Sequence, residues 1–320
     1  LTREQRYTIC TMLQSGYPQC EIARVINKDK SVVSREIRRN ADARSGEYKD
    51  DLAHRKYLKR QAYKAKARTF TPEVEAYVRD KLRLKYSPEQ IAGVAKTNGD
   101  NCVSHERIYQ FIWQDKRKKG TLYLDLRNRG RRYKKRSVIY DKRGTIPNRT
   151  DISLRPPEVE QRERFGDLEI DLIIGKNHKN AILTINDRAT GLAKLCKLTG
   201  KDAEQLAVAT IDCLKDWKPY LHTITSDNGK EFSSHQMIAT ELNIDFFFAK
   251  PFASWQRGSN ENYNRLVRQY IPKKVDFDYV THDYVKYVEQ QLNNRPRKRF
   301  GYLSPNQIVS KVWNTLEKSG

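Results

Sequence analysis

The sequence has no long apolar run and few cysteines. No stretch approaches the roughly 20 apolar residues that a membrane-spanning helix needs, and the first residues have no basic and then apolar leader pattern. We therefore expect a cytoplasmic protein with no membrane partner. The cysteines have no CxxC or Cys/His spacing typical of metal sites, and they are predicted to be reduced and mostly buried. They are Cys10, Cys20, Cys102, Cys196 and Cys213.

Acidic residues are scarce relative to basic ones, but only in one part of the chain. Residues 1–150 contain 37 Lys/Arg and 17 Asp/Glu, a net charge of +20, whereas residues 151–320 contain 25 and 22, a net charge of +3. Such an excess, with tyrosine and arginine interleaved, favours a nucleic-acid partner over a membrane surface. A ribosomal or merely solvated basic protein is the alternative, and the ordered motifs that follow argue against it.

The beginning of the chain has the pattern of a helix-turn-helix unit. Thr2 and Gln5 form a capping box that predicts a first helix. Two further helices are expected, over 19–27 and, capped by Ser31, over 32–39. A small three-helix bundle with a charged face is the alternative. If the unit binds DNA, the polar face of the last helix supplies the contacts, namely Ser34, Arg35, Arg38 and Arg39.

A second helical unit repeats this pattern. Ser87-Pro88-Glu89-Gln90 combines a capping box with proline at the first helical position. A later helix is expected to begin after Ser104, with His105 and Arg107 on its polar side as candidate DNA contacts. We therefore predict two helix-turn-helix domains in tandem.

Residues 127–136 form a block of positive charge in which seven of ten residues are basic. Such a block repels itself and cannot build a core, so it is predicted to be a linker or an arm that follows phosphates. The candidate DNA contacts within it are Arg131, Arg132, Lys134, Lys135 and Arg136.

Beyond the basic block the pattern changes from helices to strands. Apolar alternation over 168–175 predicts a strand, with Leu168, Ile170 and Leu172 on one side. The remaining elements are expected as strands over 181–186, 193–198, 222–226 and 244–249, and as helices over 202–214, 234–242 and 259–270. This order predicts an α/β domain with a mixed sheet, and it resembles the ribonuclease H fold.

The whole chain is thus predicted to be multidomain, with all-α domains before the α/β domain. The expected boundaries are 1–55 for the first helix-turn-helix domain, 56–120 for a linker helix and the second, 121–157 for the basic linker, 158–280 for the catalytic domain, and 281–320 for a helical tail.

Three carboxylates in the α/β part could converge. Asp171 lies within the first strand, Asp227 follows the fourth strand at an Asp-Asn-Gly turn, and Glu261 lies in the first turn of a helix. In this layout the first and fourth strands can be neighbours. Phosphodiester chemistry on DNA commonly uses two divalent cations about 3.5–4 Å apart, which such oxygen ligands can hold. We therefore predict two Mg²⁺ ions, replaceable by Mn²⁺, at these residues.

Each carboxylate also has a structural explanation. Asp227 could serve only its turn, and Glu261 could be only a helix-start carboxylate favoured by the dipole. Asp167 and Glu169 share the strand face of Asp171, and either could be the ligand instead. The three predicted ligands are persuasive only together.

Three further residues lie near these carboxylates in the sequence. Lys230 and Arg257 are candidate phosphate contacts, and Trp255 is a candidate platform for stacking a base. Solvated surface explains the two cations equally well, and anchoring of the loop explains the tryptophan.

Several segments together resemble the insertion-sequence-thirty family of DDE transposases, over almost the whole chain. They are Ser34-Arg35-Glu36-Ile37-Arg38-Arg39-Asn40, Ser87-Pro88-Glu89-Gln90-Ile91-Ala92-Gly93, Val103-Ser104-His105-Glu106, Asp171-Leu172-Ile173-Ile174-Gly175-Lys176, Asp227-Asn228-Gly229-Lys230-Glu231-Phe232, Trp255-Gln256-Arg257-Gly258-Ser259-Asn260-Glu261-Asn262 and Leu292-Asn293-Asn294-Arg295-Pro296-Arg297. The family usually has an aromatic residue at the position of Leu168 and a smaller residue at that of Ile170. Neither departure removes a ligand.

The resemblance implies a function and partners. Asp171, Asp227 and Glu261 would be the catalytic residues, with the family's own spacing between the last two. The helical units would bind the terminal inverted repeats in double-stranded DNA. Metal-dependent nicking would free a 3′-hydroxyl, which would attack target DNA without a covalent protein intermediate. We also expect a homodimer or larger homo-oligomer on DNA, associated with the nucleoid when bound.

Two other classes of function remain as alternatives. A non-catalytic helix-turn-helix regulator would keep the DNA-binding units but has no need of the carboxylates. A retroviral-type integrase shares the chemistry, but usually begins with a His/His/Cys/Cys zinc module, and this sequence has no such spacing.

Overall fold

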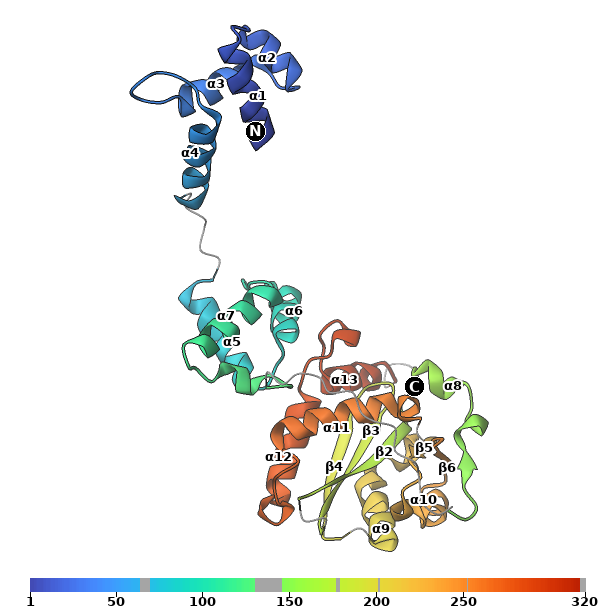
Figure 1. The fold of residues 1–320 in the computed structure, drawn as a ribbon. Coiled ribbons are helices and arrows are strands. Elements are labelled where there is room, and N and C mark those ends of the chain that lie inside the picture. The colour runs from blue at the N-terminus through green and yellow to red at the C-terminus, as the bar shows by residue number, and fades with distance from the viewer. Residues whose placement is uncertain (64–69, 130–145, 177–178, 201, 252, 317–320) are drawn as a thin grey trace. The chain divides into compact units, whose positions relative to one another are not determined.

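The computed structural model describes residues 1–63, 70–129, 146–176, 179–200, 202–251 and 253–316. The chain separates into two compact units, Leu1–Arg68 and Thr69–Gly320 (Figure 1). The predicted DNA contacts Arg131, Arg132, Lys134, Lys135 and Arg136 lie outside the described residues.

The first unit is helical, as expected. Its elements are α1 (Arg3–Gln14), α2 (Gln19–Val25), α3 (Lys30–Asn40) and α4 (Asp50–Tyr63). The predicted capping box of Thr2 and Gln5 is confirmed. The predicted cap of the third helix is wrong, because the carboxylate of Asp29 accepts the backbone N–H of Ser31 at 2.7 Å, and the helix therefore begins earlier. The core is built from all four helices, by Ile9, Ile22, Val33 and Ala53 among others.

The second helical unit comprises α5 (Pro72–Arg83), α6 (Pro88–Asn98), α7 (His105–Arg117) and the 3-10 turn η1 (Leu122–Asp125). The capping box at Ser87 and the cap at Ser104 are present as predicted. Gly99 ends α6 with a φ of +76°, a conformation that glycine adopts without strain. The apolar faces of these helices pack together in a core that includes Val78, Leu82, Ile91, Ile108 and Ile112.

A six-stranded mixed sheet follows, in the order β1-β6-β5-β2-β3-β4. Its strands are β1 (Thr150–Asp151), β2 (Asp167–Ile174), β3 (Ala181–Asp187), β4 (Ala193–Leu198), β5 (Thr223–Ser226) and β6 (Asp245–Phe248). β2, β3 and β4 form an antiparallel meander, whereas β2, β5, β6 and β1 pair in parallel. The first and fourth predicted strands, now β2 and β5, are therefore neighbours. The two-residue strand β1 was not predicted.

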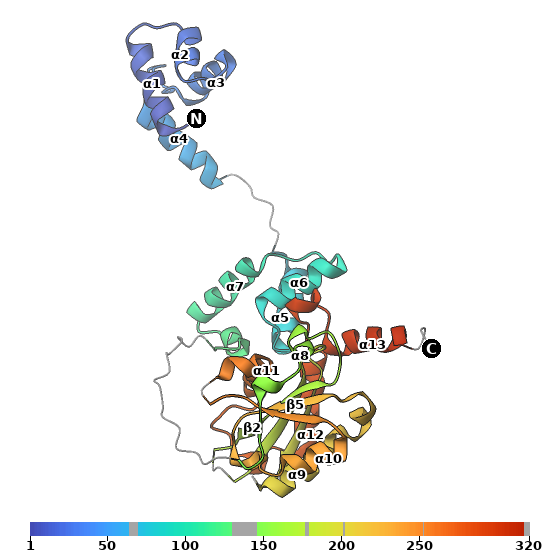
Figure 2. The same ribbon diagram turned by 90° about the vertical axis from the view of Figure 1, so that its right-hand side faces the viewer.

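Helices cover both faces of this sheet (Figure 2). α9 (Ala203–Leu214) and α10 (His235–Leu242) pack on one face, against Leu168 and Ile170 of β2. α11 (Gly258–Tyr270) and α12 (His282–Asn293) pack on the other, against Ile173 of the same strand. Alternate residues of β2 thus enter opposite cores, as the period of two in the sequence predicted. The order of the elements confirms an α/β domain with a ribonuclease H-like layout.

Short elements complete the fold. They are α8 (Glu158–Gln161), α13 (Pro305–Leu316) and the 3-10 turns η2 (Ile152–Leu154), η3 (Lys215–Tyr220), η4 (Lys230–Phe232), η5 (Ser254–Arg257), η6 (Phe277–Tyr279) and η7 (Lys298–Phe300).

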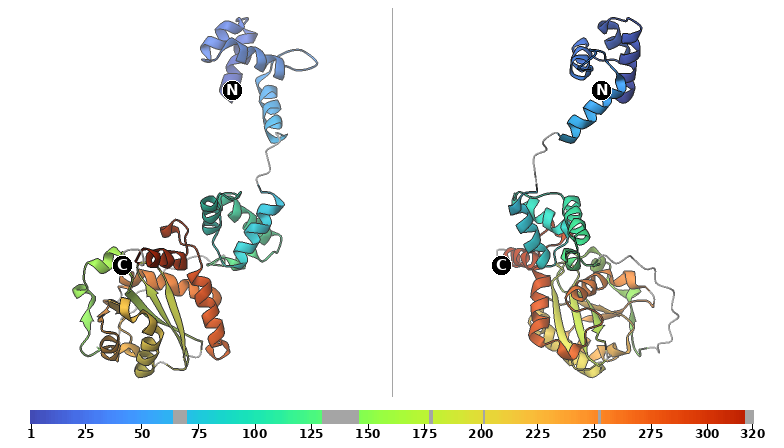
Figure 3. Two further views of the ribbon diagram at one scale, coloured as in Figure 1. Left: turned by 180° about the vertical axis from the view of Figure 1, so that it is seen from behind. Right: turned by 60° about the vertical axis from the view of Figure 1, so that its left-hand side comes forward.

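The second helical unit contacts the segment that follows α12 (Figure 3). Gln90 Nε2 donates to the carbonyl of Pro296 at 2.6 Å, and Arg295 Nε donates to Gln90 Oε1 at 3.1 Å. Gly93 of α6 lies against the Tyr302 ring, where a Cβ atom would stand 2.2 Å from the nearest ring carbon, so a larger residue would have to displace the ring. This docking was not predicted from the sequence.

Two expectations about composition can be compared with the structure. Among the described residues, no helix combines the length and apolar character needed to cross a membrane. The expectation that the cysteines are mostly buried is wrong, because only Cys10 is buried and Cys20 is exposed. Cys20 lies two positions before the buried Ile22 on α2, so the helical twist turns it away from the core.

Candidate active site

The sheet places two of the three predicted carboxylates side by side. β2 and β5 run parallel with Glu169 opposite Thr225. Asp171 lies two residues after Glu169, and Asp227 lies two residues after Thr225. The same register therefore brings Asp171 and Asp227 to neighbouring positions where β5 ends.

Arg257 joins these two carboxylates. Its Nη1 lies 3.5 Å from Asp171 Oδ2, and its Nη2 lies 3.6 Å from Asp227 Oδ2. Nη1 also donates to the carbonyl of Ile170 at 3.2 Å. Arg257 was predicted as a phosphate contact from its position in the sequence. In the structure its guanidinium lies between two like charges that would otherwise repel each other, and the phosphate contact stays a prediction.

Backbone and amide donors orient both carboxylates. Asp171 Oδ1 accepts the N–H of Leu172 at 2.8 Å, and its Oδ2 accepts Asn264 Nδ2 of α11 at 3.0 Å. Asp227 Oδ1 accepts the N–H of Gly229 at 3.0 Å, which closes the predicted turn. Each carboxylate thus has one oxygen held by a backbone N–H and the other directed at Arg257.

The ionisation of Asp171 is perturbed. Burial, together with a smaller contribution from the negative charge of Asp227, raises the pKa of its carboxyl to about 6. The Arg257 guanidinium and the N–H of Leu172 lower the pKa, but they do not outweigh burial. Strongly perturbed carboxyls in a polar cluster are typical of functional sites.

Glu261 lies near this pair but does not join it. Its Oε1 pairs with Arg265 Nη2 at 2.5 Å, and 38% of its side chain is exposed. Glu261 lies three residues before Asn264, which contacts Asp171, so the two side chains are neighbours on α11. No three His, Cys, Asp or Glu side chains of the described residues are gathered closely enough to hold one metal ion.

Asp171 and Asp227 nevertheless fit a hard divalent cation. Two carboxylate oxygens converge on one positive group, the Arg257 guanidinium. A metal ion bound by the same two oxygens would balance their negative charges in the same way. Magnesium prefers such oxygen ligands and needs few of them from the protein. Glu261 fits as a third ligand by its chemistry and its helical turn, although it is paired with Arg265.

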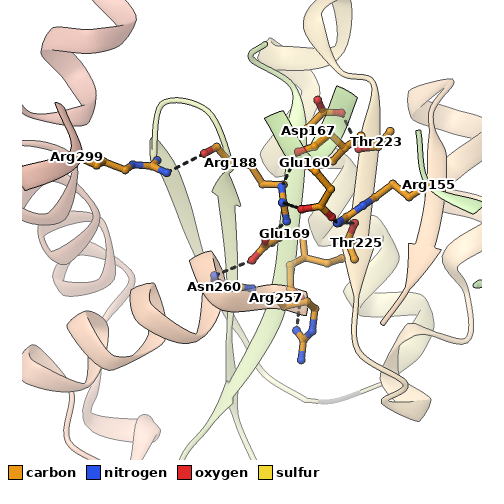
Figure 4. A network of polar contacts seen from close by, with 12 residues as sticks. Arg155, Glu160, Asp167, Glu169, Arg188, Thr223, Thr225, Arg257, Asn260 and Arg299 are labelled. Atoms are coloured by element: carbon orange, nitrogen blue, oxygen red, sulfur yellow. Dashed lines mark hydrogen bonds and ion pairs between the residues drawn. The ribbon is translucent and has the colours of Figure 1, made fainter. Parts of the chain in front are cut away.

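A mostly buried ionic network surrounds Glu169, two residues before Asp171 (Figure 4). Glu169 is fully buried and pairs with Arg188, while its Oε2 accepts the backbone N–H of Asn260 at 2.8 Å. Arg188 also pairs with Glu160 at 2.9 Å. Glu160 pairs with Arg155 as well, and the network continues from there to β5.

The network holds the three elements that carry the predicted ligands. Glu169 precedes Asp171 by two residues on β2, and Asn260 precedes Glu261 by one residue on α11. On β5, Thr225 Oγ1 accepts Arg155 Nη1 at 2.9 Å, two residues before Asp227. One network of charges, buried except for the exposed Glu160, therefore sets the relative positions of β2, β5 and α11.

Asp167 and Glu169, the two alternative ligands, are both buried and form hydrogen bonds within the protein. Both oxygens of Glu169 have partners in the network. Asp167 is 1% exposed and accepts Arg164 Nε and Thr223 Oγ1, each at 2.8 Å. Neither carboxylate faces a position that a substrate could reach.

The predicted DNA contacts differ in what they touch. Ser34, Arg35, Arg38 and Arg39 are exposed on α3, and His105 and Lys230 are exposed in α7 and η4. The Arg35 guanidinium donates to the carbonyl and the hydroxyl of Ser31, at 3.0 Å each. The Arg107 guanidinium lies over the Phe70 ring, 4.9 Å from its centroid. Trp255 lies in η5, and its side chain is outside the description.

Sequence reasoning missed Asn264, Arg188 and Arg155. Asn264 could have been found, because a residue three positions after a candidate ligand shares its helical face. The two arginines were missed because the contacts that tie them to the sheet, Arg188 to Glu169 and Arg155 to Thr225, join residues that are distant in the sequence.

Comparison with known proteins finds relatives that match this chain over nearly its full length. Residues 1–40 match a family described as a helix-turn-helix domain. The chain is 52% identical over 314 residues to the transposase for insertion sequence element IS4351 of Bacteroides fragilis, covering 98% of this chain and 96% of the relative. It is 31% identical over 324 residues to the transposase InsI for insertion sequence element IS30A of Escherichia coli (strain K12), covering 97% and 83%.

Among solved structures, the catalytic core domain of BIV integrase is similar with 17% sequence identity and a TM-score of 0.38. The match covers 47% of this chain and 97% of that domain.

Proposed function

Because the chain belongs to the family of insertion-sequence transposases that includes the IS30 transposase, we propose that it cuts and rejoins DNA at the ends of its own element. The reaction is a metal-dependent transesterification with Asp171, Asp227 and Glu261 as the ligands. The observation that carries this proposal is the convergence of Asp171 and Asp227 on one cation, Arg257.

The residues of the site have separable roles. Asp171 and Asp227 would hold Mg²⁺ or Mn²⁺ between them, and Glu261 would contribute a further ligand from α11. When bound, two such ions activate the attacking oxygen and stabilise the leaving oxygen. Asn264 holds the Asp171 carboxylate in place through its 3.0 Å hydrogen bond. Arg257 is positioned to hold a phosphate oxygen once its carboxylate partners are neutralised.

DNA recognition belongs to the helical units. The exposed face of α3 is suited to the major groove, because Ser34, Arg35, Arg38 and Arg39 project from one side of a helix whose other side is buried. This face would recognise the terminal inverted repeats. Two ends must be held together during transposition, so the active species is a homodimer or a larger homo-oligomer on DNA.

The proposed chemistry is tested with Asp171→Asn, Asp227→Asn and Glu261→Gln in the full chain. Nicking and strand transfer with Mg²⁺ or Mn²⁺ should fall by about a thousandfold, since a lost metal contact costs several kcal/mol of transition-state stabilisation. Binding to element-end DNA in a mobility-shift assay should persist, because α3 lies in the other unit.

The matched control is Asp216→Asn, a carboxylate that is 88% exposed and lies in η3. Its activity should equal that of the unsubstituted chain. Full activity in any of the three ligand variants would contradict the proposed set of ligands. If a variant loses activity but its single-turnover rate of nicking is unchanged, the substituted residue acts in DNA binding instead. Light scattering on complexes with end DNA should show at least a dimer, and joining by a monomer would contradict the assembly.

A further inference from the structure

A cavity of about 480 Å³ lies between α6, α11 and the segment after α12. This volume is in the range of sites that bind small molecules or parts of larger ones. Its lining is strongly basic. Glu89 is the only carboxylate among the described lining residues, whereas the cations are Arg127, Arg162, Arg295, Arg297, Lys298 and Arg299.

The arginines of this cavity mostly contact neutral oxygens. Arg295 is 2% exposed, and it donates to the side-chain oxygens of Gln90 at 3.1 Å and Gln269 at 2.9 Å. Arg297 Nη2 donates to the carbonyl of Leu292 at 3.0 Å. Arg299 and Arg127 likewise donate to the backbone carbonyls of Arg188 and Asn262, among others.

These charges also act on one another. Burial, together with a smaller contribution from the positive charge of Arg127, lowers the pKa of Arg295 and of Arg297 to about 10. The Lys298–Glu89 pair, at 2.5 Å, is an ion pair at the rim with the lysine 70% exposed. Removing several like charges from water without carboxylate partners costs free energy, unless an anion completes the site.

Two buried hydroxyl groups also favour an anionic ligand in this cavity. Ser259 Oγ and Tyr263 OH are buried, belong to lining residues of the cavity, and have no hydrogen-bond partner. Buried hydroxyls without partners are rare in proteins and call for an explanation. Guanidinium groups together with hydroxyl donors form the usual environment of a phosphate.

The cavity adjoins the candidate active site through one turn of helix. Gly258 and Ser259 line it and follow directly after Arg257, which contacts Asp171 and Asp227. A Cβ atom at Gly258 would meet nothing within 4 Å, so the start of α11 is open. A DNA strand held at the carboxylates can therefore continue past this turn.

We propose that this basic cavity binds backbone phosphates of the DNA strand whose end is processed at Asp171 and Asp227. The inference rests on the proposed function. The cations come from three separate segments around residues 127, 162 and 295–299, so they suit more than one phosphate along a strand. Through Gln90 and Arg295, the second helical unit forms one wall of the site.

The test uses the full chain with the double substitution Arg127→Gln and Arg162→Gln, both at exposed positions. Affinity for duplex DNA carrying the element end is measured over a range of salt concentrations without metal. Each lost phosphate contact should reduce the slope of log K against log salt by about 0.9. The expected reduction is therefore about 2, with circular dichroism and melting temperature unchanged.

The matched control is Lys215→Gln with Lys218→Gln, which removes the same charge from exposed positions in η3. Its salt slope should stay that of the unsubstituted chain. Equal slopes for all three proteins would overturn the proposal, and so would equal reductions in both double variants.

A second arm separates a DNA strand from a small phosphate ligand. Inorganic phosphate, added at constant ionic strength, should not compete with DNA for the unsubstituted chain. Competition that disappears in the Arg127→Gln, Arg162→Gln variant would identify a small-oxyanion site and overturn the proposal. Because these measurements need no metal, their failure is distinguishable from failure of the proposed chemistry, which the ligand variants report.

Discussion

Two carboxylates on one strand show how differently this fold treats the same chemistry. Glu169 and Asp171 lie two residues apart on the same face of β2. Glu169 is fully buried, and both its oxygens are engaged by Arg188 and the N–H of Asn260. Asp171 is 24% exposed, and its nearest cation is 3.5 Å away. A fully buried carboxylate in a close ion pair supports the architecture, whereas a partly exposed carboxylate without a close ion pair stays available for a ligand.

The arginines opposite them differ in the same way. Arg188 is 1% exposed and contacts Glu169, Glu160 and the carbonyl of Val159. Arg257 reaches its two carboxylates only at 3.5 and 3.6 Å, and its buried Nε has no acceptor. The looser arginine is therefore the one that can exchange its partners.

The largest expected effect is on stability, from Glu169→Gln. The substitution leaves Arg188 buried with a weaker set of partners, so unfolding of the unit Thr69–Gly320 should require on the order of 3 kcal/mol less. Chemical denaturation measures this loss. Glu158→Gln, which removes a carboxylate that is 64% exposed, should change stability by less than about 0.5 kcal/mol. Similar stability for both variants would break the comparison.

Asp171→Asn should instead raise the free energy of unfolding. The pKa of Asp171 is raised to about 6 in the folded protein, above the ordinary value of 3.8. The stability that protonated Asp171 contributes is therefore present below pH 3.8 and lost as pH rises through 6. Without metal at pH 7.5 the asparagine variant should be about 1–2 kcal/mol more stable, since one pKa unit corresponds to about 1.4 kcal/mol.

The gain from Asp171→Asn should shrink towards zero as the pH falls below 4. Melting curves of both proteins over this range, recorded with a chelator, give the difference directly. A variant that is less stable at pH 7.5, like Glu169→Gln, would show that Asp171 is also a structural carboxylate.

The smallest expected effect is on metal affinity, from Arg257→Gln. Removing the resident cation leaves Asp171 and Asp227 without their shared partner, so Mn²⁺ should bind about tenfold more tightly, or by about 1.4 kcal/mol. Calorimetric titration of Mn²⁺ without DNA measures this change. Arg79→Gln, in a surface pair on α5, is the control and should bind Mn²⁺ as the unsubstituted chain does. Unchanged or weaker binding would show that Arg257 does not compete for the metal position.

Much of the fold could be predicted because its signals are local. The capping boxes at Thr2 and Ser87 depend on residues three positions apart, and the alternation in β2 depends on every second residue. Even the error at Ser31 was local, since Asp29 two positions earlier was the better acceptor for the same helix start. The order of the elements allowed the first and fourth strands to be neighbours, and the structure pairs them as β2 and β5.

The sequence by itself determined the elements, the family and a short list of carboxylates. The residue pattern alone could not rank Asp171 above Glu169, because both lie on one face of one strand, and only the family resemblance favoured Asp171. The tertiary structure adds how Glu169 is engaged, by Arg188, which is 19 residues away in the sequence, and by Asn260, which is 91 residues away. Likewise, the basic cavity needs α6, α11 and the segment after α12 together. Burial and charge compensation depend on neighbours in space, and a linear pattern does not contain them.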